Sequence, residues 1–302
     1  MAEKDILEKS LMLYADVFAD CINTLVYDGR RLLDQGNTRP APTETFYQGK
    51  ERLHNQFCDA SRYMVEEGRD IVQYLIENET ELRRRQVLRK ASYQGGAYRQ
   101  QLESGSPVHA VVCIVMDWTG KSSRIPRSLH ELLEEDGVPQ EVLGQVDDVG
   151  LTVYHMNNLS AETRRKFTSD MGFVADYLNE GGFQGRSGQR ILHPVALCRM
   201  MEALTGDTRF TERVTEFMQK ERKGETVMMC EYINMLEARG EARGEARGMA
   251  KGEIKGETKL SLLLENLYGL NRDEEAKQAV LDIAVRARLY EEFHIASSVP
   301  SP

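Results

Sequence analysis

The sequence predicts an α/β fold, in which a mixed β-sheet is flanked by helices and followed by a helical C-terminal tail. Three observations predict it. An amphipathic pattern opens the chain, two β-rich runs around Gly68 precede a basic helical stretch and an apolar run, and glycine recurs every fourth residue from Gly240 to Gly256. The 302 residues, 41% of them hydrophobic and 29% charged, suffice for one main domain with an appendage.

The first elements are a helix and a loop. We expect a long helix over residues 6–26, because apolar side chains recur there every three or four positions, namely at Leu7, Leu11, Tyr14, Phe18, Ile22 and Leu25. The stretch from Asn37 to Tyr47 contains two prolines and several small polar residues, which predicts a loop.

The centre of the chain predicts the sheet. Residues 60–67 and 70–80 form a β-hairpin that turns at Gly68, since the second run is rich in β-branched and aromatic residues. A helix-forming stretch starts at Glu81, and residues 108–118 are a continuous apolar run, typical of a strand buried on both faces. The order is therefore helix, strand, strand, helix, strand.

The rest of the chain is predicted to be mainly helical. Residues 128–135 indicate a helix, residues 150–156 a further strand, and residues 160–222 several helices. We therefore expect a main domain, a glycine-repeat segment that is helical or flexible, and a C-terminal helical region, at residues 1–222, 223–258 and 259–302.

Composition limits the classes of function. No window approaches the roughly 18 apolar residues of a membrane span, and the first residues lack the pattern of a signal peptide, so we expect a cytoplasmic protein without membrane contact. The net charge of −9 disfavours a protein that coats nucleic acid, so any DNA contact needs a local basic patch. Five scattered cysteines without a CxxC pair predict buried free thiols.

The most specific local feature is a pair of glutamates, Glu77 and Glu79, at the end of the second hairpin strand. Side chains at positions i and i+2 of a strand project from the same face, and Asp59 at the start of the preceding strand could converge on them. Mg²⁺ prefers such hard oxygen ligands. The alternative is a solvated strand end, which is where most such carboxylates lie.

Several motifs in a fixed order resemble the recombination-promoting nuclease and transposase family. They are FADxxN from Phe18, LHNQFCDASRYM from Leu53, YLIENET from Tyr74, SYQGGAYRQQL from Ser92, TGDTRF from Thr205, and the glycine-repeat tail. The resemblance implies a PD-(D/E)XK restriction-endonuclease-like fold and DNA cleavage with Mg²⁺ or Mn²⁺. It also implies that Asp59 is the motif aspartate and that Glu77 is the acidic residue of the (D/E)xK signature, both as metal ligands.

The third motif position departs from this pattern. Glu79 stands where the superfamily has lysine and where this family usually has glutamine. A lysine positions water and stabilises developing negative charge, whereas a carboxylate can ligate metal or accept a proton. Three hypotheses follow: an active endonuclease in which Asp59, Glu77 and Glu79 are catalytic, a family member without a nuclease centre that acts as a DNA-binding or oligomeric scaffold, and a helical assembly protein.

Two further sets of residues are candidates for the site. Superfamily members often contribute an acidic residue from the opening helix, which makes Asp20 a candidate metal ligand; the alternative is an ordinary solvent-facing position. The densest basic stretch is predicted to hold the DNA backbone and consists of Arg83, Arg84, Arg85, Arg89, Lys90 and Arg99. Its alternative is a solvated face that pairs with Glu79 and Glu81.

The glycine repeat suggests a partner of the same kind. Glycines four residues apart form a ridge on a helix that lets another helix approach closely, and no opposite charges within the repeat lie three or four residues apart. Residues 239–258 and the C-terminal helices are therefore predicted to support a homo-oligomer. A solvated linker is the alternative. The six histidines lack ligand spacing and are expected to be structural.

Overall fold

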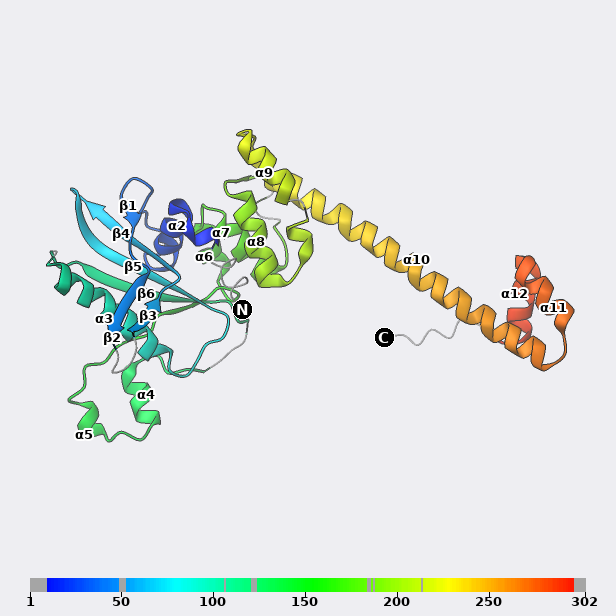
Figure 1. Ribbon diagram of the computed structural model, residues 1–302, viewed down its shortest axis with the longest axis horizontal. Coiled ribbons are helices and arrows are strands. Elements are labelled where there is room, and N and C mark those ends of the chain that lie inside the picture. Colours follow the sequence, from blue (N-terminus) through cyan, green and yellow to red (C-terminus); the bar gives the residue numbers. More distant parts are fainter. Residues whose placement is uncertain are drawn as a thin grey trace. The chain divides into compact units, whose positions relative to one another are not determined.

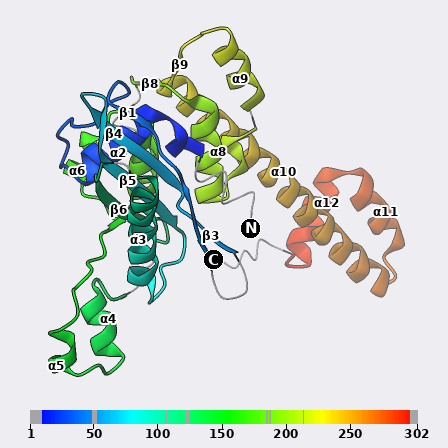
Figure 2. The same ribbon diagram turned by 60° about the vertical axis from the view of Figure 1, so that its left-hand side comes forward.

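The computed structural model describes residues 10–48, 53–105, 107–120, 124–183, 186, 188–212 and 214–295. It divides into two compact units, Met1–Asn234 and Met235–Pro302. Figures 1 and 2 show the elements of both units.

A five-stranded mixed sheet forms the centre of the first unit, which confirms the predicted α/β class. The strand order is β1-β4-β5-β6-β7, with β1, β4 and β5 antiparallel and β5, β6 and β7 parallel. The strands are β1 (Thr38–Pro40), β4 (Ala60–Glu66), β5 (Arg69–Glu79), β6 (Ala110–Asp117) and β7 (Val153–His155).

The predicted hairpin is confirmed as β4 and β5. Glu67 and Gly68 connect the strands with φ of 49° and 76°, as expected at the two central residues of a type I′ turn, whose twist matches that of the strands. The chain then crosses over through α3 (Gln86–Ser104) to the parallel strand β6. Helix α3 begins at Gln86 and not at Glu81, because the intervening Leu82 is buried in the core beside Val115.

The two faces of the sheet are covered by different helices. Helix α3 packs on one face through Tyr93 and Ala97, which contact Leu75 and Cys113. On the other face Tyr74 is hydrogen-bonded to Tyr27, just beyond the end of α2 (Ala15–Leu25), over a distance of 2.6 Å between hydroxyl oxygens. In Figure 1, α3 and α2 accordingly lie on opposite sides of the strands. The alternation of side chains along β5 therefore decides which residues face α3.

The predicted opening helix is interrupted. Residues 10–13 form a 3₁₀ turn, α2 starts only at Ala15, and Tyr14 between them is extended, with φ −75° and ψ 131°. Tyr14 stacks on His193 with the ring centroids 3.6 Å apart, a contact distant in sequence that local periodicity does not reveal. Residues 6–9 lie outside the described residues.

The predicted loop at residues 37–47 is also partly wrong. It contains β1 and β2 (Glu44–Gln48), and β2 pairs with β3 (Leu53–Phe57) in a separate antiparallel hairpin. Pro40 is compatible with β1 because this strand is short and lies at the edge of the sheet, where a missing N–H is tolerated.

The helices expected after the sheet are present. They are α4 (Leu129–Glu135), α6 (Ala161–Lys166), α7 (Met171–Glu180), α8 (Pro194–Thr205) and α9 (Val214–Arg222), and a short helix that was not predicted from the sequence, α5 (Gln140–Leu143), follows α4. A 3₁₀ turn, η3 (Thr208–Phe210), follows α8. Two short strands, β8 (Arg190–Ile191) and β9 (Val227–Met228), pair with each other within this region. Strand β9 and the buried Tyr232 extend the first unit beyond residue 222, the end that the sequence suggested.

The glycine repeat is helical, as part of α10 (Met229–Gly269). In the second unit the end of α10 packs with α11 (Asp273–Leu281) and α12 (Ile283–Glu292) around a small apolar core formed by Leu263, Leu267, Ala276, Ala279, Leu289 and Ile295. Of the helices in the described ranges, none combines the length and the apolar character needed to cross a bilayer. Four of the cysteines are buried as predicted, but Cys230 is exposed.

Candidate active site

The hairpin brings Asp59 next to Glu77. Ala60, the first residue of β4, pairs with Ile76, so Asp59 directly before it lies near Glu77, and the Asp59 N–H donates to the Ile76 carbonyl over 3.2 Å. The Asp59 carboxylate also accepts the backbone N–H of Asn78, with 2.6 Å between Oδ2 and N. The proximity expected from the sequence is therefore present.

Glu77 and Glu79 are buried on the α3 side of the sheet. Their residues are 2% and 9% exposed, which excludes the alternative of a solvated strand end. Their burial follows from the neighbours of β5, because Glu77 pairs with Val115 and Glu79 with Asp117 on the interior strand β6. Burying two carboxylates is unfavourable unless other groups compensate their charge.

Helix α3 supplies that compensation. Arg89 Nη1 lies 2.6 Å from Glu79 Oε1, and Arg89 Nη2 lies 3.6 Å from Glu77 Oε2. Gln86 Nε2 donates to the same Glu79 oxygen over 2.8 Å. Tyr93 Oη accepts from Arg89 Nη2 over 3.2 Å, which holds the guanidinium against the strand end. These side chains lie on successive turns of one face of α3.

Burial and the neighbouring charges shift the pKa values of the side chains in this cluster. Burial, followed by the Asp59 carboxylate, raises the pKa of Glu77 to about 9, despite the opposing effect of Arg89. Burial also raises the pKa of Glu79, although Gln86 and Arg89 lower it in part. Burial next to Glu77 raises the pKa of Tyr93 to about 12. Strongly shifted carboxylates of this kind are characteristic of functional sites, although structural ion pairs also produce them.

One oxygen of the cluster has no partner. Glu77 Oε1 is buried and receives no hydrogen bond from any described residue. An orphaned carboxylate oxygen beside Asp59 fits a hard cation, since Mg²⁺ needs only one or two protein carboxylates and keeps several waters. Within the described ranges no three acidic, histidine or cysteine side chains converge as a ready-made metal site. The donors that fit are thus Glu77 and Asp59.

Asp20 does not belong to this cluster, so its prediction as a metal ligand is wrong. Both of its oxygens are engaged: Oδ2 accepts the backbone N–H groups of Thr168 and Ser169 over 2.9 and 2.8 Å, and Oδ1 pairs with Arg31 at 2.7 Å. Asp20 is only 2% exposed, so the solvent-facing alternative is wrong as well. The carboxylate joins α2 to the segment before α7.

The predicted basic stretch is only partly available to a ligand. Arg84 pairs with Glu135 and Asp136, Arg83 lies 3.9 Å from Glu81, and Lys90 donates to the Gly150 carbonyl over 2.7 Å. Arg85 and Arg99 are exposed and make no ion pair with any residue that the structure describes. Exposed ion pairs contribute little stability and exchange readily, so the pairs of Arg83 and Arg84 do not preclude contact with phosphate.

Sequence reasoning missed a second polar group at the same end of the sheet. His155 Nδ1 lies 2.5 Å from the buried Asp117 Oδ2, and Arg127 Nη2 lies 2.9 Å from His155 Nε2. Arginine can only donate, so His155 accepts at Nε2 and carries its proton on Nδ1. The signal was available, because Asp117 and His155 each end a predicted strand, and carboxyl ends of parallel strands meet at one edge.

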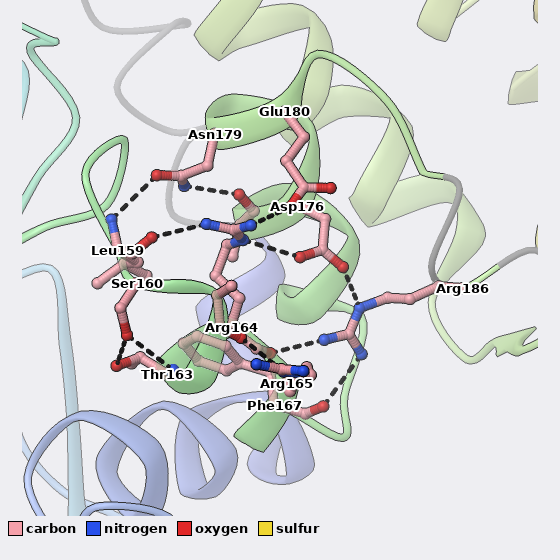
Figure 3. A network of polar contacts seen from close by, with 12 residues as sticks. Leu159, Ser160, Thr163, Arg164, Arg165, Phe167, Asp176, Asn179, Glu180 and Arg186 are labelled. Carbon is pink, nitrogen blue, oxygen red and sulfur yellow. Dashed lines mark hydrogen bonds and ion pairs between the residues drawn. The ribbon is translucent and has the colours of Figure 1, made fainter.

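A cleft elsewhere in the first unit is structural. It measures about 650 Å³ and is lined by Arg164, Asp176 and Arg186 among others. Both arginines are buried and share Asp176, over 3.1 and 2.5 Å, and Arg186 also donates to the carbonyls of Phe167 and Arg164 (Figure 3). Arg164, Asp176, Glu180 and Arg186 thus have protein partners, and the network joins α6 and α7 to the loop after them.

Comparison with known proteins gave no relative: no family model, no curated protein and no solved structure matches the chain.

Proposed function

We propose that the protein is a DNA endonuclease of the PD-(D/E)XK type, related to the recombination-promoting nucleases, that uses Mg²⁺ or Mn²⁺. The observation that carries the proposal is the proximity of Asp59, directly before β4, to Glu77, together with an orphaned oxygen on Glu77. Two carboxylates at a strand end are sufficient to hold a divalent cation next to a phosphate.

The topology around these residues supports the same proposal. Helix α2 precedes the antiparallel strands β1, β4 and β5, which helix α3 then connects to the parallel strand β6. This places the two carboxylates where the hairpin opens, with α3 beside them and the exposed Arg85 directly before the start of that helix. A duplex that contacts this end of the sheet would meet both the acidic pair and a source of positive charge.

The residues have separable tasks in hydrolysis of a phosphodiester. A divalent cation supplies Lewis-acid stabilisation and a more acidic water when it is bound. Glu77 and Asp59 would ligate it through their carboxylate oxygens. Glu79, held by Gln86 and Arg89, can orient a water molecule or accept a proton from it. Its raised pKa makes the carboxylate a stronger base than an ordinary glutamate.

A second candidate function is a scaffold that binds DNA or assembles without cutting. The ion pairs of Arg89 with Glu77 and Glu79 favour it, because a guanidinium already neutralises the carboxylates that would hold the metal. In this case the cluster would be a buried ion pair with only a structural role.

Cleavage of supercoiled plasmid separates the two candidates. We expect the wild type to nick DNA with Mg²⁺ or Mn²⁺ but not with EDTA, and Asp59→Asn and Glu77→Gln each to lose at least about 100-fold in rate, as expected for the loss of a group that acts mainly in the transition state. Glu81→Gln is the matched control, since the Glu81 side chain is 80% exposed. If the wild type does not cleave DNA with either Mg²⁺ or Mn²⁺, only the scaffold function would remain.

Glu79→Gln tests the unusual third position. Glutamine restores the residue usual in the family that this sequence resembles and removes one negative charge beside Glu77. We expect metal-dependent cleavage to persist or rise. Complete loss of cleavage, with the fold intact, would show instead that the Glu79 carboxylate is itself essential.

A further inference from the structure

The guanidinium of Arg89 reaches from solvent to the interior of the candidate site. Its side chain is 40% exposed, whereas the side chains of Glu77 and Glu79 are 3% and 11% exposed. One end of the fork is held tightly, at 2.6 Å from Glu79, and the other loosely, at 3.6 Å from Glu77. Arg89 therefore occupies oxygens that a divalent cation would also use.

We propose that Arg89 is a tethered counter-ion that holds Glu77 and Glu79 in the free protein and moves to a backbone phosphate when DNA binds. DNA and a divalent cation then bind cooperatively. This inference rests on the proposed function, because it takes Glu77 as a ligand of the cation and DNA as the substrate.

The first step of the argument is that Arg89 and the cation compete. Both are positive and both are attracted to the same two carboxylates, so each weakens binding of the other at this distance. Glu77 Oε1 has no partner among the described residues and can receive a cation while Arg89 is still present. Coordination through Glu77 Oε2 as well, however, requires Arg89 to leave.

The second step is that phosphate is a suitable alternative partner for Arg89. A guanidinium binds phosphate in the same bidentate geometry as a carboxylate, and the Arg89 side chain is long enough and exposed enough to turn outward. Arg85, the residue directly before α3, is exposed and makes no ion pair with a described residue. Arg85 thus adds an unpaired positive charge at the start of the helix that carries Arg89.

The third step is thermodynamic. If phosphate removes Arg89 from the carboxylates, it removes the competitor of the cation, and by reciprocity the cation must strengthen DNA binding by the same factor. A purely structural ion pair predicts no such coupling. The tethered counter-ion and the structural ion pair therefore differ in whether the affinity for DNA depends on the cation.

The experiment measures the affinity of the full chain for a fluorescent DNA duplex by anisotropy, in EDTA and in Ca²⁺ at matched ionic strength. In parallel, calorimetry measures Ca²⁺ binding without DNA. For the wild type we expect Ca²⁺ to tighten DNA binding by about 10-fold or more, within the usual range of coupling. In Arg89→Gln the ratio of the DNA affinity in Ca²⁺ to that in EDTA should fall several-fold. Ca²⁺ binding without DNA should tighten by about 5-fold.

Arg69→Gln is the matched control, because it removes the same charge from an exposed side chain at the turn of the hairpin, 3.9 Å from Glu67. It should keep the wild-type ratio. Arg89→Lys keeps a positive charge next to the buried carboxylates and serves if Arg89→Gln does not fold. Its single ammonium cannot bridge both glutamates. Arg89→Lys should therefore change the DNA-affinity ratio and the Ca²⁺ affinity in the same directions as Arg89→Gln, but by smaller factors.

The outcomes separate this inference from the proposed function. If Glu77→Gln abolishes Ca²⁺ binding but Arg89→Gln and Arg89→Lys keep the wild-type affinity and ratio, the tethered counter-ion is overturned and the metal site stands. If the wild type binds no Ca²⁺, or binds it equally well after Glu77→Gln, both ideas are overturned.

Discussion

Glu77 illustrates, at the scale of a residue, how function and stability oppose each other in this fold. Its carboxylate is buried, one oxygen has no hydrogen-bond partner among the described residues, and Asp59 lies directly before the adjacent strand. A group chosen for stability alone at this position would be apolar or neutral. The retention of a carboxylate is readily explained if a cation binds to it.

The pH dependence of stability follows from the raised pKa of Glu77. Burial and Asp59 raise this pKa from its ordinary 4.5 to about 9, so the folded protein favours the protonated form. The contribution of Glu77 to stability is therefore complete below pH 4.5 and is lost as the pH rises toward 9. We expect Glu77→Gln, measured by urea unfolding in EDTA at pH 8, to be more stable than the wild type by about 1 to 3 kcal/mol.

The control for this measurement is Glu81→Gln, whose exposed side chain should leave the unfolding free energy nearly unchanged. The difference between Glu77→Gln and the wild type should shrink at pH 5. An equal difference at both pH values would contradict the assigned titration of Glu77.

At the scale of elements, the network that joins α6 and α7 depends on the close approach of Arg186 to Gly172, which only glycine permits. A Cβ added at Gly172, the second residue of α7, would lie 2.4 Å from Cζ of Arg186. That guanidinium is buried and donates hydrogen bonds to the carbonyls of Phe167 and Arg164. It therefore cannot move without losing these hydrogen bonds.

We expect Gly172→Ala to destabilise the protein by about 1 to 3 kcal/mol in thermal or urea unfolding, as overpacking usually does. Gly95→Ala is the matched control, because Gly95 lies within α3 and a Cβ there meets no atom within 4 Å. It should stabilise by about 0.5 to 1 kcal/mol through its higher helix propensity. Equal effects of both substitutions would refute the packing role of Gly172.

Much of the fold could be predicted from local pattern, and the exceptions share one cause. The hairpin, α3 and β6 were predictable because alternation and apolar runs report burial directly, and the proximity of Asp59 and Glu77 followed from the hairpin. The break at Tyr14 and the role of Asp20 depend on His193 and on residues 168–169, which are far away in sequence. No local pattern encodes such partners.

The interior of the site was only partly predictable for the same reason. The sequence placed basic residues on α3, but it did not show that Arg89 turns inward to Glu77 and Glu79 while Arg85 stays exposed. Helix periodicity gives the face of a residue only when the face packed against the sheet is known. That face is set by Tyr93 and Ala97, which contact the strands.

At the scale of the whole molecule, the chain consists of two units with different architecture, joined within one helix. Along the described part of the repeat, a Cβ added at Gly248, Gly252 or Gly256 meets no atom within 4 Å. The glycine ridge of α10 is thus free of contacts within the chain at these positions. We propose that it packs against the same helix of a second copy.

Substituting alanine at these three glycines tests that proposal. Each alanine should stabilise α10 by about 1 kcal/mol, seen as a higher melting temperature of the helical signal at 222 nm. At the same time the added Cβ atoms would hold a neighbouring helix farther away, so self-association in sedimentation equilibrium should weaken. An unchanged association constant would show that the ridge is not the contact.

The central claim is that Asp59 and Glu77 together form a divalent-cation site. Its most direct test is a titration of the full chain with Mn²⁺, followed by electron paramagnetic resonance of the free ion. We predict binding that is lost in Asp59→Asn and in Glu77→Gln but kept in Asp20→Asn, whose carboxylate is engaged with Thr168, Ser169 and Arg31. Binding of Mn²⁺ that survives in Asp59→Asn and Glu77→Gln, or no binding by the wild type, would contradict the claim.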